Sequence, residues 1–304
     1  MILLRDYVAF VEDGFSPHHP NEPKSGVVRI NPQDVPLFFK LYGNNGKKYI
    51  IISFDSDYGI DYQSNHHPNM DLIKMVHYYK WDEIQSRKGA YVALGLGPAC
   101  VAENCNIDDN YSVKVYSFTH ATFNQVPDNI VRWYSTNVNV NHSKIVGLPI
   151  GYHDGIVKII DQFMGKEKPH LCYVNYRNHT MERVHLSQYF RTKTWCKVLN
   201  ESIPVEEYLA DIAAHKFTIC PPGVGYDTFR VYESIKLGTI PIVLNSTFNH
   251  HLRELPVLFV DDYKSLTVEY LEEIYNSSSK YNWNWDKLTL SYWAKLIEED
   301  KKLL

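Results

Sequence analysis

Residues 216–244, KFTICPPGVGYDTFRVYESIKLGTIPIVL, combine residue types that suit a phosphate-containing ligand. An apolar run typical of a β-strand ends at two prolines, which cannot continue a ladder of backbone hydrogen bonds. Gly223 and Gly225 follow, and glycine permits positive φ angles and a close approach of the backbone to a ligand. We expect Asp227 or Thr228 to cap a helix whose amino end attracts phosphate groups. The stretch therefore predicts a phosphate-binding loop between a strand and a helix.

Arg230 and Glu233 are three residues apart on this predicted helix and so face the same side. An arginine near the start of a helix can donate two hydrogen bonds to a diphosphate. A carboxylate one turn further along can accept hydrogen bonds from ribose hydroxyls. Gly238 is expected to end the helix. The pair predicts a nucleoside diphosphate site, and the alternative is a surface ion pair between two helix neighbours. The stretch is not a P-loop, because no Gly-Lys-Ser/Thr follows, and it is an incomplete dinucleotide fingerprint, because Thr228 stands where the third glycine would be.

The stretch resembles the donor-site motif of exostosin-like glycosyltransferases, the family-forty-seven type, whose pattern runs roughly C/S-P-x-G-x-G-x-D-T-x-R-x-x-E-x-x-x-x-G-x-I-P-I-V. The resemblance covers about residues 144–270 and includes residues 171–190, LCYVNYRNHTMERVHLSQYF, where Arg183 falls on an arginine of the family. Val224 departs from the pattern, which more often has asparagine there. The matching positions are Cys220, Pro221, Gly223, Gly225, Asp227, Thr228, Arg230, Glu233, Gly238, Ile240, Pro241, Ile242 and Val243.

This resemblance implies a GT-B enzyme, in which two Rossmann-like α/β halves face a cleft. It also implies an inverting transfer from a UDP-sugar, without a metal cofactor such as Mn²⁺. Xylose is our choice of sugar, because the sequence looks most like xylosyltransferase-like members. Glu233 would hold the ribose, while Arg230 and Arg183 would neutralise the diphosphate. The donor-binding residues that the resemblance implies are Asn175, Arg183, Pro222, Gly223, Gly225, Tyr226, Asp227, Thr228, Arg230 and Glu233.

An inverting transfer needs a base that takes a proton from the acceptor hydroxyl. Asp57 follows the apolar run Lys48–Phe54 and is the first candidate, and His153 is a secondary one. The triplet Asp55-Ser56-Asp57 also has the form of the Mn²⁺ site of GT-A glycosyltransferases, which leaves a Mn-dependent enzyme as an alternative. Its position counts against that role, because the predicted nucleotide motif lies in the other half of the chain.

The predicted elements that position these residues alternate between strands and helices, which indicates an α/β fold with a parallel sheet. We expect an acceptor-binding domain over residues 1–155, a nucleotide-sugar-binding domain over 156–285, and a C-terminal helix over 286–304 that packs back across. In the first half, strands are expected at Lys48–Phe54, Ala90–Leu96, Val113–Phe118 and Lys144–Ile150, with a helix at Met70–Lys80. In the second half, strands are expected at Leu171–Val174, Thr194–Leu199, Lys216–Cys220, Thr239–Leu244 and Leu255–Val260, with helices at Met181–Phe190, Val205–His215, Asp227–Leu237, Ser265–Tyr275 and Trp285–Leu304.

The composition is that of a globular protein: 304 residues, 44% hydrophobic and 22% charged, with a net charge of −4. This charge does not suggest a nucleic-acid binder. No apolar run reaches the length of a membrane span, and the start, MILLRDYVAF, does not read as a signal peptide. We therefore expect a cytoplasmic chain, with a trimmed lumenal domain as the alternative. The five cysteines form no C-x-x-C motif or paired framework, so reduced and mostly buried thiols are expected.

The partners expected from this interpretation are a nucleotide sugar and an oligosaccharide or glycoconjugate acceptor. Two other classes of function stay open. One is a catalytically silent subunit that binds a glycan or a nucleotide sugar, and the other is a nicotinamide-dependent enzyme. The pair His250-His251 follows a predicted strand and is expected at the surface.

Overall fold

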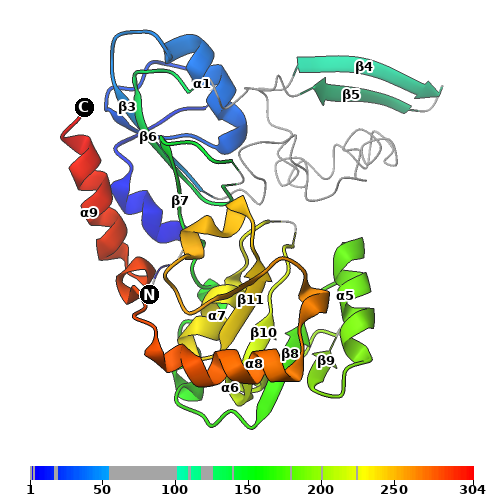
Figure 1. Ribbon diagram of the computed structural model, residues 1–304. Helices are drawn as coiled ribbons and strands as arrows, with labels where there is room; N and C mark the ends of the chain where they lie inside the picture. Colours follow the sequence, from blue (N-terminus) through cyan, green and yellow to red (C-terminus); the bar gives the residue numbers. More distant parts are fainter. Residues whose placement is uncertain are drawn as a thin grey trace. The chain divides into compact units, whose positions relative to one another are not determined.

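The chain folds into two compact units, each with its own five-stranded parallel sheet (Figure 1). The N-terminal unit comprises Tyr7–Leu148 and Lys295–Leu304, and the C-terminal unit comprises Met1–Asp6 and Pro149–Ala294. The computed structural model describes residues 2, 4–16, 20–54, 101–108, 111–117, 126–138, 140–178, 180–199, 201–223 and 225–304. Two parallel sheets confirm the predicted α/β class.

The sheet of the N-terminal unit has the order β1-β2-β3-β6-β7. Every residue of β3 is buried, as its uninterrupted apolar sequence YIIIS requires of a central strand. Helix α1 packs on this sheet through Phe38, and Trp133 donates a hydrogen bond to the Ser53 hydroxyl (2.9 Å). The elements are β1 (Asp13–Gly14), β2 (Val27–Arg29), α1 (Val35–Tyr42), β3 (Tyr49–Ser53), β6 (Ile130–Ser135) and β7 (Ile145–Gly147), with 3₁₀ turns at Leu4–Phe10 and Pro32–Asp34.

A separate antiparallel hairpin is formed by β4 (Val101–Asp108) and β5 (Tyr111–Ser117). The predicted helix Met70–Lys80 and strand Ala90–Leu96 lie outside the described residues. The triplet Asp55-Ser56-Asp57 lies outside them too. The roles of Asp57 as base and of this triplet as a metal site therefore stay predictions.

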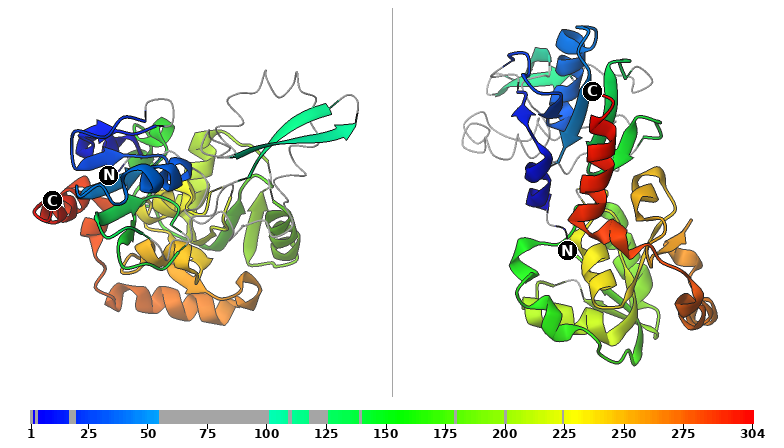
Figure 2. Two further views of the ribbon diagram at one scale, coloured as in Figure 1. Left: turned by 90° about the horizontal axis from the view of Figure 1, so that it is seen from above. Right: turned by 90° about the vertical axis from the view of Figure 1, so that its left-hand side faces the viewer.

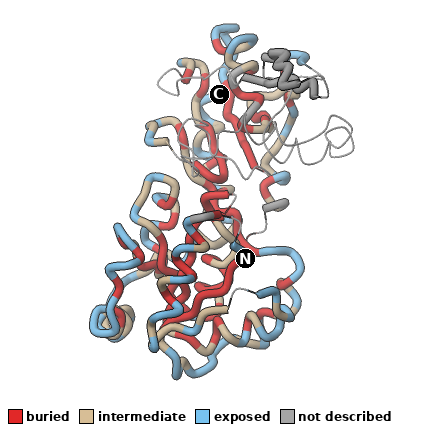
Figure 3. The backbone as a smooth tube through the Cα atoms, turned by 90° about the vertical axis from the view of Figure 1, so that its right-hand side faces the viewer, coloured by how far each residue is buried: buried red, intermediate tan, exposed pale blue. Residues whose placement is uncertain are grey.

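The sheet of the C-terminal unit has the order β12-β11-β10-β8-β9, with every pair parallel. Helices α6 and α7 cover one face, and α5 and α8 cover the other (Figures 1 and 2). The strands between them are mostly buried (Figure 3). The elements are β8 (His170–Asn175), α5 (Met181–Arg191), β9 (Cys196–Leu199), α6 (Val205–Ala214), β10 (His215–Ile219), α7 (Phe229–Lys236), β11 (Ile240–Leu244), β12 (Leu258–Val260) and α8 (Val268–Ser277), with 3₁₀ turns at Asp154–Ile156, Ile160–Phe163, Thr247–Leu252, Tyr263–Ser265 and Ser278–Lys280.

Side chains of this sheet alternate between two cores. Cys172 and Val174 of β8 join the core under α5 and α8, whereas Tyr173 between them joins the core under α6 and α7. The period of two residues is that of a strand covered on both faces. Ile156 and Ile160, from the connection that precedes β8, complete the second core. The alternation of strands and helices predicted for this half is therefore confirmed.

The C-terminal helix differs from the prediction of one helix over Trp285–Leu304. A 3₁₀ turn at Trp285–Leu288 comes first, and α9 (Leu290–Lys301) follows it. Thr289 separates them, with an extended backbone (φ −114°, ψ 145°) that a continuous helix does not allow. Within the N-terminal unit, the Asp300 carboxylate near the end of α9 accepts hydrogen bonds from Arg132 Nε (3.0 Å) and Tyr134 OH (2.6 Å) on β6. No helix in the described part of the chain has the length and apolar character needed to cross a membrane.

Gly238 ends α7 with a positive φ angle of 70°. Its amide donates to the Ile235 carbonyl (3.0 Å), and the Thr239 amide donates to the Ser234 carbonyl (2.8 Å), which together form a Schellman motif. This motif turns the chain directly into β11 and confirms the predicted helix end.

We expect Gly238→Ala to lower the free energy of unfolding by about 1–2 kcal/mol, because an L-residue resists this backbone conformation. A Cβ atom would find space there, with its nearest described neighbour, Lys168 Cε, at 3.7 Å. The cost therefore comes from the backbone alone. Urea denaturation measures it, with Gly14→Ala as the control, since Gly14 has no positive φ and no atom of the described residues within 4 Å of the added Cβ. Equal stability of the two variants would contradict the prediction.

Candidate functional site

The carboxyl ends of β8 and β10 and the amino end of α7 meet at one edge of the sheet in the C-terminal unit. Ligands of parallel α/β sheets bind at this edge. Asn175 ends β8, and its side-chain amide donates a hydrogen bond to the Tyr173 hydroxyl (3.0 Å). Cys220 directly follows β10 and leads into Pro221 and Pro222. The residues of the predicted phosphate-binding loop thus lie where the fold class places a ligand.

Arg183 anchors this loop. Its guanidinium donates hydrogen bonds to three backbone carbonyls: Nε to Pro222 (2.8 Å), Nη2 to Pro221 (3.0 Å) and Nη1 to Arg177 (3.1 Å). The side chain extends from the first turn of α5, where the Thr180 hydroxyl caps the Arg183 amide (3.2 Å). Arg183 therefore positions the loop, and its direct contact with a phosphate stays a prediction.

Gly223 differs from the sequence-based expectation. Its φ angle lies outside the positive range, so left-handed backbone does not explain the glycine. A Cβ atom at this position would lie 2.8 Å from Arg183 Nη2, a distance that real Cβ contacts avoid. Glycine is required because the guanidinium of Arg183 passes directly against the backbone.

Arg230 places a second cation beside the first. Its guanidinium carbon lies 5.6 Å from the centre of the Tyr176 ring, and that of Arg183 lies 5.3 Å from the same ring. Burial, followed by the charge of Arg230, lowers the pKa of Arg183 to about 10. Among the described residues, no carboxylate lies within ion-pair distance of either guanidinium, and nothing accepts a hydrogen bond from the buried Nε of Arg230. The charge of Glu233 helps to stabilise Arg230, but among the described residues no carboxylate pairs directly with either of these neighbouring cations, which makes this edge a suitable site for an anion.

Glu233 lies one turn further along α7 and is only 4% exposed. Its Oε2 accepts a hydrogen bond from the Tyr208 hydroxyl on α6 (2.6 Å). Burial raises the pKa of this carboxyl, while the Tyr208 hydrogen bond and the charges of Arg230 and His153 act in the opposite direction. Its burial excludes the alternative in which Arg230 and Glu233 form an ordinary surface ion pair.

Several buried polar atoms at this end of the unit lack a hydrogen-bond partner among the described residues. Thr228 occupies the N-cap position of α7, yet its hydroxyl caps no helix amide. Such atoms are rare in folded proteins unless water or a ligand satisfies them. They are Thr218 Oγ1, Thr228 Oγ1 and Arg230 Nε.

Asp227 has a different role from the predicted helix cap. Its Oδ2 accepts hydrogen bonds from the Ile150 amide (3.1 Å), His251 Nε2 (3.0 Å) and the Tyr232 hydroxyl, and its Oδ1 accepts from the Thr228 amide (2.9 Å). The His251 side chain is 3% exposed, so the surface position expected for it is wrong. Because protein donors surround the carboxylate, Asp227 holds the start of α7 in place.

His153 lies in the C-terminal unit, although the sequence suggested a position in the first half. Its ring packs edge-on against Phe229, the first residue of α7, at 5.4 Å. Nδ1 accepts a hydrogen bond from the Gly155 amide (3.0 Å), so the neutral ring carries its proton on Nε2. In this tautomer neither nitrogen is available to accept a proton, which argues against His153 as the base.

Tyr226 and Pro222, the remaining predicted donor-site residues, are both buried. The Tyr226 ring packs against Phe248 (4.7 Å between centroids), and the Pro222 carbonyl accepts the hydrogen bond from Arg183 Nε. Gly225 closes the loop, because its carbonyl accepts a hydrogen bond from the Gly223 amide (2.8 Å). No group of three or more metal-binding side chains suited to a metal ion occurs among the described residues.

Sequence reasoning missed two aromatic residues of the site. Tyr208 donates a hydrogen bond to Glu233. The sequence could have indicated it, because Tyr208 lies three residues after Val205 on the helix face that was assigned to the core. Tyr176 contacts both arginines, and the available signal was its place two residues after the predicted strand Leu171–Val174, at the ligand edge of the sheet.

Comparison with known proteins adds an independent finding. The sequence model of the family described as the RXYLT1 C-terminal domain matches residues 174–295, which contain most of the site described above. Ribitol-5-phosphate xylosyltransferase 1 of Danio rerio is 28% identical over 120 residues, a match that covers 34% of this chain and 28% of that protein. The chain therefore matches well under half the length of that relative.

We expect Glu233→Gln to gain stability relative to the wild type as pH rises from about 4 to about 7. The folded protein holds the proton of Glu233 above the usual pKa of 4.5, so the wild type loses stability as pH rises from there through the raised pKa. Glutamine cannot ionise and escapes this loss. Urea denaturation of both proteins across this pH range tests it. A stability difference that stays constant, or that moves toward the wild type, would show that Glu233 ionises without a burial penalty.

Proposed function

We propose that the chain is an exostosin-like glycosyltransferase that moves xylose from UDP-xylose to a hydroxyl of a glycoconjugate acceptor. The transfer would invert the anomeric centre and require no metal ion. One observation carries the proposal: two adjacent arginines and a buried glutamate stand at the ligand edge of a parallel sheet, and the arginines have no carboxylate partner among the described residues. The xylosyltransferase match supports the choice of sugar.

Arg230 would bind and stabilise the leaving group. Transfer of a sugar leaves negative charge on the departing diphosphate, and a fixed cation in a partly dry site stabilises that charge more than it stabilises the neutral parts of the donor. Arg230 Nε and the Thr228 hydroxyl, at the start of α7, are donors without a hydrogen-bond partner in the described part of the chain. Arg183 would add a second positive charge, from a side chain that donates hydrogen bonds to the carbonyls of Pro221 and Pro222.

Glu233 would recognise the ribose. Tyr208 occupies Oε2 of the carboxylate and thereby fixes its orientation. A ribose hydroxyl that donates to the carboxylate favours its ionised form, because hydrogen bonds to a charged group stabilise that charge. The cost of keeping Glu233 buried without a ligand would then be recovered when the donor binds.

Asp57 remains the first candidate for the base, and the hydrogen bond that Nδ1 of His153 accepts from the Gly155 amide makes His153 the weaker one. The acceptor would be an oligosaccharide or glycoconjugate hydroxyl bound by the N-terminal unit, in a GT-B arrangement of the two units. The printed name of the Danio rerio relative makes a ribitol phosphate the first acceptor to test.

A thermal-shift experiment tests the donor. We expect UDP and UDP-xylose to raise the melting temperature in EDTA as much as in Mn²⁺, because arginines rather than a metal ion would neutralise the diphosphate. Glu233→Ala should remove the response while the unliganded variant still melts cooperatively.

UDP-glucuronate, UDP-N-acetylglucosamine, UDP-galactose, UDP-glucose, GDP-sugars and NAD define the specificity. A response that needs Mn²⁺ would favour the Asp55-Ser56-Asp57 alternative, and no response to any nucleotide would favour a silent subunit.

Arg230→Ala is expected to lower the turnover of sugar transfer by about 100- to 1,000-fold, the usual cost of removing one donor that stabilises transition-state charge. Its melting temperature should change little, because no described residue accepts a hydrogen bond from Arg230 Nε. Arg191→Ala, at the exposed end of α5, is the control and should keep its activity. Wild-type turnover by Arg230→Ala would remove this residue from the mechanism.

A further inference from the structure

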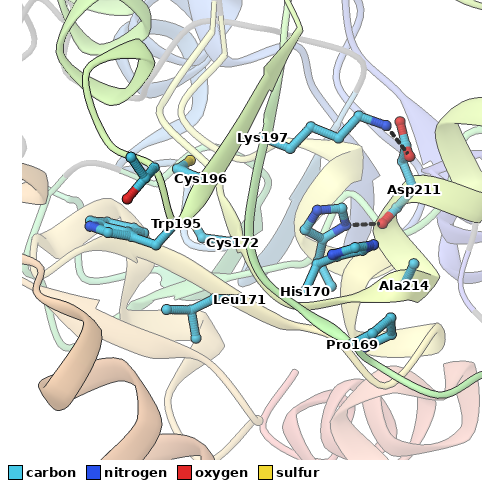
Figure 4. Close-up of a pocket in the computed structure, with 11 residues that line it drawn as sticks. Pro169, His170, Leu171, Cys172, Trp195, Cys196, Lys197, Asp211 and Ala214 are labelled. Carbon is cyan, nitrogen blue, oxygen red and sulfur yellow. Dashed lines mark hydrogen bonds and ion pairs between the residues drawn. The ribbon is translucent and has the colours of Figure 1, made fainter.

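A pocket of about 420 Å³ lies at the other end of β8, where the strands of the C-terminal unit begin (Figure 4). Lys197, Asp211 and His170 stand on one side of it, while Trp195, Cys196 and Cys172 stand on the other. β8 begins in this pocket at His170 and ends at Asn175 in the candidate donor site. The pocket is thus separate from that site.

Two thiols lie side by side in this pocket. Cys172 on β8 is the register partner of Cys196 on β9, and both side chains enter the same core, under α5 and α8. Neighbouring strands lie about 4.7–4.9 Å apart, within the range of about 4.4–6.8 Å that a disulfide needs between Cα atoms. Both cysteines are free thiols in this structure. Their separation by 23 residues in the sequence gave no sign of a pair.

The two thiols differ in access. Cys172 is completely buried, and Cys196 is half-buried on the edge strand β9, where it lines the pocket. Burial, followed by the hydrogen bond with Cys196, raises the pKa of Cys172 well above its usual value. An incoming reagent therefore meets the more exposed Cys196 first.

We propose that Cys172 and Cys196 form a redox-reactive dithiol, which closes to an intramolecular disulfide by exchange with a small-molecule disulfide that enters the pocket. The thiolate of Cys196 attacks one sulfur of the reagent, forms a mixed disulfide and releases one thiol. Cys172 then loses its proton and attacks the Cys196 sulfur, which releases the second thiol. Two protein thiols are oxidised, one small disulfide is reduced, and the two thiol protons leave on the two small thiols.

The bond would affect more than the two strands. The chain between Cys172 and Cys196 contains all of α5, which carries Arg183. A disulfide would tie the two ends of this segment together and restrict its local opening. The inference stands independently of the sugar-transfer proposal, because it rests on the strand register and the pocket alone.

Peptide mapping tests the proposal on the folded full chain. The protein is incubated with oxidised glutathione, its remaining thiols are alkylated, and it is digested without reductant. We expect a cross-linked peptide pair that joins Cys172 to Cys196, with a mass about 2 Da below the sum of the two reduced peptides. Glutathione that stays on Cys196 while Cys172 remains a thiol would overturn the proposal, and so would two unmodified thiols.

Single variants separate the two steps. Cys172→Ser should trap glutathione on Cys196, because no second thiol is present to release it. Cys196→Ser should leave Cys172 unmodified, because the buried thiol does not meet the reagent directly.

Cys220→Ser is the matched control, since Cys220 is also buried, directly after β10, but is not paired in register with another cysteine, and it should cross-link like the wild type. Equal modification of Cys172 with and without Cys196 would contradict the proposed order. Should a variant fail to fold, the wild-type map decides the proposal by itself.

Discussion

The structure of the candidate site depends on two guanidinium groups that the fold brings together, with no carboxylate among the described residues close enough to form an ion pair with either. Burying an unpaired charge costs several kcal/mol, so the protein must compensate each arginine in another way. Arg183 uses three backbone carbonyls, and this choice fixes the path of residues 221–223. Arg230 lies over the face of Tyr176 and leaves its buried Nε without a partner among the described residues. The first arginine stabilises the loop, and the second remains available to a ligand.

Glu233 is likewise buried at a cost to the stability of the fold. A buried carboxyl with a raised pKa works against stability at neutral pH, and an apolar residue at this position of α7 would pack at lower cost. One hydrogen bond from Tyr208 does not satisfy two carboxylate oxygens. The hydroxyls of Thr218 and Thr228, which lack a hydrogen-bond partner among the described residues, add to the cost. Where a fold violates local rules of polar satisfaction, the violations tend to collect at functional sites. Here they collect along α7 and on the neighbouring strand β10.

Much of the C-terminal unit could be predicted from its sequence, because local patterns determine it. β10, α7 and β11 follow from an apolar run, a helical spacing and Gly238, and the spacing of Arg230 and Glu233 predicts both on one side of one helix. Two features could not be predicted, since they arise from contacts between distant segments. The contact that requires Gly223 comes from Arg183, 40 residues earlier. The partners of Asp227 come from Ile150 and His251, and a short motif cannot contain them.

The N-terminal unit was harder to predict for a different physical reason. β6, with the sequence IVRWYS, lacks clean alternation, and α1 is too short for a clear helical period. Both are stabilised by tertiary packing, around Trp133 and Phe38 respectively. Such segments follow the core that surrounds them more than their own propensity. A resemblance limited to one half of the chain gave no help here.

β8 connects the two chemical features of the C-terminal unit. Cys172 and Asn175 are three residues apart, which in an extended strand corresponds to about 10 Å. Tyr176, which lies against both arginines, follows directly. A covalent bond at Cys172 would therefore fix the strand whose end supports the cation pair, and the segment it closes would include Arg183. Because a buried central strand deforms little, a bond at one end is expected to change the mobility of the site more than its shape. Such an effect would reach ligand binding through the entropy of ordering the loop, with the arrangement of charges unchanged.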